Sequence, residues 1–323
     1  MKLKDLYSKA VDKGIERDPR TRKAVEANLK KTAKEYDKLS KAEKEYFDNE
    51  SLTNPYADTR ILFGGEETEI NSVLVGIDID AGELLLADRL RQTGRSIDLC
   101  LAHHPAGSAL VNLHEVMKMQ ADILAALGIP INVADALLDE RAKEVERKLM
   151  PLNHNRAVDA ARLLNIPFVC IHTPADNCVA MFLQGIFDKE KPQYLSDVID
   201  ILMEVPEYKI SKMSQNGPKI LLGSRDSRTG KVFVDMTGGT SGNKRSFEKL
   251  SQAGVGTVVT MHMSEEHRKE AKKHMLNVVI AGHIGSDNLG LNIILDEIEN
   301  GEPLNIIECS GFKRIRRGKE ASS

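Results

Sequence analysis

Short apolar runs alternate with segments of helical periodicity over most of this chain, from about residue 70 to residue 308. Residues 72–79 (SVLVGIDI) and 97–102 (IDLCLA) are apolar on both faces, which is typical of strands buried between helices. Amphipathic stretches such as residues 83–92 lie between such runs. Strands that alternate with helices predict an α/β protein. The other expected helices cover 114–127, 134–149, 155–164, 247–253, 264–274 and 289–298, and the other expected strands cover 167–171, 219–222, 231–236, 257–260, 277–281 and 304–308.

The alternation occurs twice along the chain, which predicts two similar α/β lobes. We assign residues 61–205 to the first lobe and residues 206–323 to the second, and we allow the lobes to interleave. Residues 1–60 differ from the rest because they are rich in Lys, Glu and Ala and have almost no strand pattern. They predict a helical N-terminal extension that packs on the core or on a partner subunit.

Histidine follows four of the expected strands, at the point where each strand ends. Five of the nine histidines of the chain stand at these exits, and two of them have a carboxylate four residues later. In α/β sheets, ligands and catalytic groups gather beyond the carboxyl ends of the strands, so this placement predicts one shared polar site. The residues of this candidate site are His103, His104, His172, Asp176, His262, His283 and Asp287.

The residue types at these strand ends predict a metal centre. Imidazole nitrogen and carboxylate oxygen together suit zinc, iron, manganese or nickel rather than calcium. Adjacent His103 and His104 cannot point the same way on a regular strand, but at a strand end turned by Pro105 they can diverge toward two neighbouring ions. We therefore predict two divalent ions. The predicted ligands are His103, His104, Asp176, His283 and Asp287.

Each of these residues also has an ordinary structural explanation. A single histidine at a strand end is usually a hydrogen-bonded group, and Asp176 alone can be a turn residue. Asp287 alone can be an acid in the first turn of a helix that begins near Ser286, where the helix dipole stabilises a carboxylate. The placement of all these residues at neighbouring strand ends favours a metal site over these separate explanations.

Composition narrows the class of protein further. No apolar run approaches the ~20 residues that cross a bilayer, and the first residues lack the apolar region of a secretory signal. The four cysteines form no CxxC pair and suit reduced thiols, so we expect a cytoplasmic protein. A net charge of −3 and only 4% aromatic residues argue against nucleic acid as a partner. Ser286 does not lie in a GxSxG turn, which argues against a Ser–His–Asp triad.

Three segments carry a resemblance to a known family. AHHPAG at 102–107, IHTPAD at 171–176 and AGHIGSD at 281–287 resemble, in order and spacing, motifs of the Nif-three-like family, also called the GTP cyclohydrolase 1 type 2 family. The resemblance covers roughly residues 60–310. It implies two similar α/β lobes with a dinuclear metal site in the cleft between them, and a toroidal homohexamer.

The resemblance also implies a role for each ligand. His103 and His104 would each bind one ion, and Asp176 would share its ion with one of them. His283 would bind the other ion, and Asp287 would bridge both.

Two positions depart from the family pattern. The bridging acid of the family is usually glutamate in a GHxxxE pattern, whereas Asp287 is one methylene shorter. Where the family tends to show Thr-Gly-acid, this chain reads Thr260-Met261-His262, so His262 can be an extra ligand, a proton shuttle or a tolerated replacement. The Gly-rich segment 237–243 resembles a family loop, and it suits either an anion cradle or a tight turn.

The sequence therefore predicts a dinuclear metal-binding protein that hydrolyses a nucleotide-like or cyclic amide substrate. In this interpretation His172 and His262 move protons. The alternative is a non-enzymatic metal-binding, metal-delivery or regulatory protein, in which weaker bridging by Asp287 would favour exchange of the ions. Fold and metal alone do not select between these functions, so whether the chain is an enzyme stays open at this point.

Overall fold

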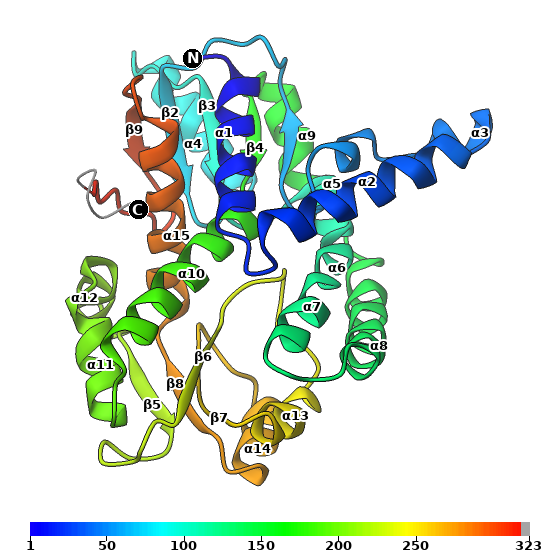
Figure 1. Ribbon diagram of the computed structural model, residues 1–323. Coiled ribbons are helices and arrows are strands. Elements are labelled where there is room, and N and C mark those ends of the chain that lie inside the picture. The colour runs from blue at the N-terminus through cyan, green and yellow to red at the C-terminus, as the bar shows by residue number, and fades with distance from the viewer. Residues whose placement is uncertain (318–323) are drawn as a thin grey trace.

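The structure is a computed structural model that describes residues 1–317, and its strands form two mixed sheets (Figure 1). The first sheet has the strand order β1-β4-β3-β2-β9 and the second has the order β5-β8-β7-β6. In each sheet one edge strand, β1 or β5, is antiparallel to its neighbour and the other strands are parallel. The strands are β1 (Arg60–Phe63), β2 (Ser72–Gly76), β3 (Leu99–Ala102), β4 (Phe168–Cys170), β5 (Lys219–Leu222), β6 (Lys231–Asp235), β7 (Val255–Thr260), β8 (Asn277–Ile280) and β9 (Asn305–Glu308).

Helices precede β1 and connect most of the strands. They are α1 (Leu3–Glu16), α2 (Arg22–Lys38), α3 (Lys41–Lys44), the 3₁₀ helix η1 (Asn49–Leu52), α4 (Ala81–Gln92), α5 (Gly107–Val111), α6 (Leu113–Val116), α7 (Met119–Ala126), α8 (Ile131–Leu149), α9 (Arg156–Leu164), α10 (Thr173–Glu190), α11 (Leu195–Glu204), α12 (Pro206–Met213), α13 (Ser246–Gln252), α14 (Glu265–Lys273) and α15 (His283–Ile298). The predicted α/β class and the two similar lobes are confirmed.

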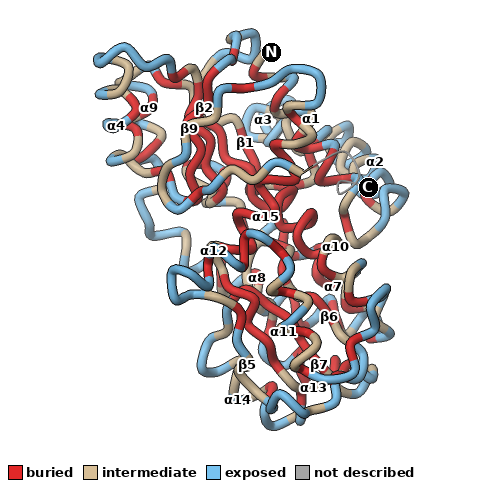
Figure 2. Tube along the Cα trace, turned by 90° about the vertical axis from the view of Figure 1, so that its left-hand side faces the viewer, coloured by how far each residue is buried: buried red, intermediate tan, exposed pale blue. Residues whose placement is uncertain are grey.

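Alternate residues of the strands pack on opposite sides of each sheet, which produces a layered core. In β2, Leu74 packs with α4 and α9, whereas its neighbours Val73 and Val75 pack with α1, α10 and α15. In the second sheet, Phe233 of β6 packs with α7, α8 and α13, and Val234 faces α10 and α15. Helices α10 and α15 therefore lie between the inner faces of both sheets, and Figure 2 shows them buried in the middle of the molecule.

The crossing of α10 and α15 positions the candidate site. α10 follows β4 and α15 follows β8, which are equivalent places in the two sheets. The helices approach closely because Gly290 has no side chain: a Cβ there would lie 2.4 Å from the backbone oxygen of Ala175. Asp176 follows Ala175, and Asp287 lies one turn before Gly290, so this contact brings the two acids toward each other.

The N-terminal helices are present, and they divide into two parts. α1 packs on α10 and α15, and its Leu3, Leu6 and Ala10 belong to the central core. α2 and α3 lead away from the body of the molecule and are mostly exposed (Figure 1). Of the predicted extension, therefore, α1 is an integral part of the core. Contact of α2 or α3 with a partner subunit stays a prediction.

Several element predictions were wrong in detail. α15 begins at His283, not near Ser286, because Gly282 adopts a φ of 112° that ends the strand directly before the helix. Asp287 thus lies beyond the first turn, and the helix dipole does not account for it. The helix expected at 114–127 is broken into α6 and α7. The sequence pattern did not predict β1 or α10; α10 is buried around most of its first half and lacks a polar stripe.

No helix among residues 1–317 has both the length and the apolar character needed to span a bilayer.

Candidate metal centre

The seven predicted site residues come together in one cleft where the two lobes meet. The cleft has a volume of about 440 Å³, and all seven line it. The exits of β3, β4, β7 and β8 supply the histidines, and α10 and α15 supply the two acids. The strand-end pattern therefore identified residues that lie together in space.

Asp287 lies at the centre of this cluster. Its side chain is completely buried, and within residues 1–317 neither carboxylate oxygen has a hydrogen-bond partner. Oδ1 lies 3.6 Å from Nε2 of His103. Oδ2 lies 3.6 Å from Nε2 of His104 and 3.6 Å from Nε2 of His283. A buried carboxylate without donors is costly, so this arrangement calls for a compensating positive charge.

The distances in the cluster fit a shared ion better than hydrogen bonds. Two atoms that bind one zinc ion tetrahedrally at about 2.1 Å lie about 3.4 Å apart. A nitrogen–oxygen hydrogen bond is shorter, at about 2.7–3.2 Å. His103 Nε2 lies 3.5 Å from Oδ1 of Asp176 and 3.6 Å from Oδ1 of Asp287. The residues present therefore fit divalent ions held between them.

The cluster divides into overlapping groups of three, each with ligand atoms within 4.8 Å of one another. One group is His103, Asp176 and Asp287, and another is His104, His283 and Asp287. Asp287 belongs to both, with a different oxygen facing each set of imidazoles. The third group adds His172 to His103 and His104, which makes His172 a candidate ligand as well as a candidate proton carrier.

Three of the imidazoles are oriented by hydrogen bonds at Nδ1, so that Nε2 faces the cleft. His103 bonds to the backbone oxygen of Ile171 at 3.1 Å. His104 bonds to Asp78 at 2.7 Å, and His172 bonds to Asp58 at 2.8 Å. Such partners fix the ring and raise the basicity of the other nitrogen.

Sequence reasoning missed both orienting acids, Asp58 and Asp78. Asp78 stands two residues beyond β2, whose carboxyl end lies at the same sheet edge as the histidines, so the strand-end rule applies to it. Asp58 precedes the antiparallel edge strand β1 and gave no comparable signal.

Burial controls the protonation of the cluster. It raises the pKa of Asp176 and of Asp287 to about 7, although neighbouring histidines oppose the shift. Burial also lowers the pKa of His103 to about 3, and burial together with nearby His104 lowers that of His283 to about 3. These two rings are therefore neutral at physiological pH, as a metal ligand requires.

His172 behaves differently from these two rings. Burial alone would lower its pKa, but the carboxylates of Asp176 and Asp58 outweigh burial and raise it to about 9. Its imidazole is thus positively charged, with a proton on both nitrogens, at physiological pH in the metal-free chain.

Metal affinity is expected to rise with pH. Below their pKa of about 7 the carboxyls of Asp176 and Asp287 hold protons, which a metal ion must displace. Between about pH 6 and about pH 8 the apparent affinity for zinc should increase roughly tenfold for each carboxyl. Competition with a zinc-buffering chelator measures this change. A pH-independent affinity over that interval would show that the acids do not bind the ion.

His262 lies at the side of the cluster. Its ring is 4.9 Å from that of His283, and within residues 1–317 it belongs to none of the ligand groups. Burial, helped by nearby His267, lowers the pKa of His262, so its imidazole is neutral at physiological pH and can accept a proton.

The Gly-rich loop 237–243 also borders the cleft. Its carbonyl oxygens are held by the side chains of Gln120 and Arg141. These bonds give the loop a structural role, and anion binding by it stays a prediction.

No family model matches the chain, and no curated protein matches it. Solved structures do match. A NIF3 superfamily protein from Sphaerobacter thermophilus is 28% identical, with a TM-score of 0.69 over 79% of this chain and 92% of that one. This likeness supports assignment of the chain to the Nif-three-like family. HcgD from Methanocaldococcus jannaschii is similar to this Nif-three-like chain in fold, with 15% identity and a TM-score of 0.51 over 82% of this chain and 94% of that one.

Proposed function

We propose that this Nif-three-like chain binds two divalent ions, zinc, iron, manganese or nickel, and hydrolyses a nucleotide-like or cyclic amide substrate. The buried Asp287 carries this proposal, because its two unpartnered oxygens face two different sets of imidazoles. When bound, two such ions supply Lewis acidity and lower the pKa of a coordinated water toward neutrality.

Each ion has its own set of candidate ligands. His103 and Asp176 would hold one ion, and His104 and His283 would hold the other. Asp287 would contact both. The hydrogen bond from His104 to Asp78 keeps its ring turned toward the cleft while substrate enters and product leaves.

The remaining histidines are suited to moving protons. His262 is neutral and its ring lines the cleft, so it can accept a proton from a reacting group. His172 holds Nδ1 against Asp58, which leaves Nε2 as the atom that exchanges a proton with the cleft. His262 can therefore act as the base and His172 as the acid, each from a different wall of the cleft.

Turnover by the metal-loaded protein tests the function. Substrates should include a nucleoside triphosphate, a phosphodiester and a cyclic amide. His104→Ala is expected to reduce turnover by at least about a hundredfold, because it removes a ligand from one ion. His274→Ala is the matched control, since His274 follows the end of α14, does not line the cleft, and its ring pairs with Glu270 at 3.5 Å.

Activity that survives His104→Ala would rule out hydrolysis at this centre. If the loaded protein turns over none of these substrates but passes its metal to an acceptor chelator, the metal-delivery function replaces the hydrolase. The same preparation thus separates the two functions.

We also propose that the chain assembles as a toroidal homohexamer and acts in the cytoplasm. The family resemblance supports the hexamer. Three buried free thiols, those of Cys100, Cys170 and Cys178, support a reducing compartment.

A further inference from the structure

A second cavity lies directly beside the metal cleft. It has a volume of about 100 Å³ and is enclosed by α7, α10, β6 and α13. Six residues line both spaces: Asp235, Met236, Thr237, Ser241, Thr260 and His262. Because the two spaces share a wall, one molecule can fill the cavity and extend past His262 into the cleft.

Most of the cavity wall is apolar. Phe233, Phe247 and Leu250 line it, and all three belong to the buried cluster of the second lobe. Leu124 of α7, from the same cluster, and Met181 of α10 also line it. An apolar wall with a few polar groups is the usual design of a pocket for an aromatic or heteroaromatic ring.

Asp235 is the charged group that faces this cavity. It stands two residues after Phe233 on β6, so both side chains are on the face of the sheet that borders the cavity. Burial alone raises the pKa of Asp235 to about 6, and no charge or hydrogen bond from residues 1–317 offsets that burial. A partly buried carboxylate that faces an apolar cavity gains stability when a ligand supplies N–H donors.

Ser246 offers a second polar group. Its hydroxyl oxygen is buried and has no hydrogen-bond partner among residues 1–317. The other polar side chains around it are already hydrogen-bonded within the protein: Gln120, Gln184, Asn243 and His267. Asp235 and Ser246 are therefore available to a ligand.

We propose that the cavity binds a planar heteroaromatic ring of the substrate, and that Asp235 recognises two adjacent N–H donors on the edge of that ring. The hydroxyl of Ser246 adds one hydrogen bond. This assignment rests on the proposed function and extends it, since a ring held here places the rest of the molecule in the metal cleft. Asp235 is then a specificity-determining residue of the site.

Binding of a pair of probes to the purified full chain tests the ring site. 2-Aminopyridine protonated at its ring nitrogen presents two adjacent N–H donors, and 2-methylpyridine has the same shape without the amino donors. By calorimetry or ligand-observed NMR, the wild type should bind 2-aminopyridine about tenfold or more tightly, as expected for a hydrogen bond to a charged group. Asp235→Asn should abolish that preference, and Ser246→Ala should weaken both probes by a smaller factor.

The controls separate this site from the metal centre. Asp226→Asn, at an exposed position outside the cavity, should keep the wild-type preference, and thermal unfolding confirms that Asp235→Asn is folded. Asp287→Asn, which disables the metal centre, should leave probe binding unchanged. Equal affinity of the wild type for the two probes, binding of neither, or an unchanged preference in Asp235→Asn would overturn the ring site. If the metal-loaded wild type binds the probes as expected but turns over no substrate, the hydrolase proposal fails and the ring site stands.

Discussion

Replacing Asp287 by asparagine is expected to remove both metal ions, whereas replacing Asp176 by asparagine should remove one. Asparagine keeps the size of the side chain but exchanges one acceptor oxygen for an NH₂ donor and loses the negative charge. Because the two oxygens of Asp287 face different imidazole sets, both sets lose their shared ligand. Asp176 belongs to only one group, with His103 and Asp287.

Elemental analysis after dialysis against divalent metal measures this difference. The expected values are about two ions per chain for the wild type, fewer than one for Asp287→Asn and about one for Asp176→Asn. Asp78→Asn is the matched control, because Asp78 orients His104 without belonging to a ligand group among the described residues. It should lower affinity roughly 10–100-fold and keep both ions at saturating metal. Two tightly held ions in Asp287→Asn would exclude this residue as the bridge.

The position of α15 explains how the short side chain of Asp287 reaches the histidines. In the sequence, this aspartate is one methylene shorter than the glutamate that the family usually has. In the fold, α15 begins at His283 and presses against α10 through Gly290, which carries Asp287 deep into the cluster. Its oxygens lie 3.6 Å from three imidazole nitrogens. The position of the helix therefore brings this short side chain within reach of all three imidazoles.

The histidines of the site could be predicted because of a simple property of parallel sheets. The carboxyl ends of β3 and β4 meet at one edge, as do those of β7 and β8, so residues just past each strand converge. Asp58 could not be found in this way, since it precedes an antiparallel edge strand of four residues that has no clear alternation. Asp235 was also missed, because a charged residue at the end of a strand usually marks only an exit to solvent.

The connection between the lobes was not predictable from local pattern. β9 pairs with β2, so after the second sheet is complete the chain returns along α15 to the first. An apolar run of four residues indicates a strand but does not indicate which sheet edge it will join. That choice depends on the close packing of α15 against α10. Gly290 permits this packing because it has no side chain at the contact.

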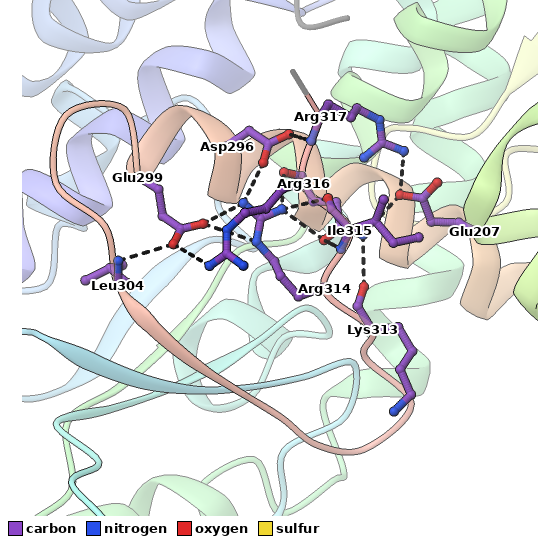
Figure 3. Close-up of polar contacts among 10 residues, drawn as sticks. Glu207, Asp296, Glu299, Leu304, Lys313, Arg314, Ile315, Arg316 and Arg317 are labelled. Carbon is purple, nitrogen blue, oxygen red and sulfur yellow. Dashed lines mark hydrogen bonds and ion pairs between the residues drawn. The ribbon is translucent and has the colours of Figure 1, made fainter. Parts of the chain in front are cut away.

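The segment after β9 provides the second large prediction, which concerns stability. Residues 313–317 run back along α15, and Figure 3 shows Arg314 between Asp296 and Glu299. The Arg314 side chain is only 5% exposed, and its two acidic partners are 10% and 9% exposed. Burial opposes ionisation of Glu299, but hydrogen bonds from Arg314 and Arg316 lower its pKa overall. The guanidinium therefore holds two buried charges on a helix that also carries the metal centre.

Arg314→Ala is expected to lower the free energy of unfolding by about 3–5 kcal/mol, because it leaves both carboxylates buried without their main partner. Arg316→Ala is the matched control: Arg316 pairs with Glu299 at 3.0 Å but is 62% exposed, so its loss should cost no more than about 1 kcal/mol. Urea unfolding of both variants, saturated with the same metal, measures the difference. Equal losses of unfolding free energy in the two variants would contradict the prediction, because the ion pairs of Arg314 would then be no stronger than an exposed pair. A large loss confined to Arg314→Ala would show that the end of the chain fastens α15, and with it Asp287, in the position that the metal centre requires.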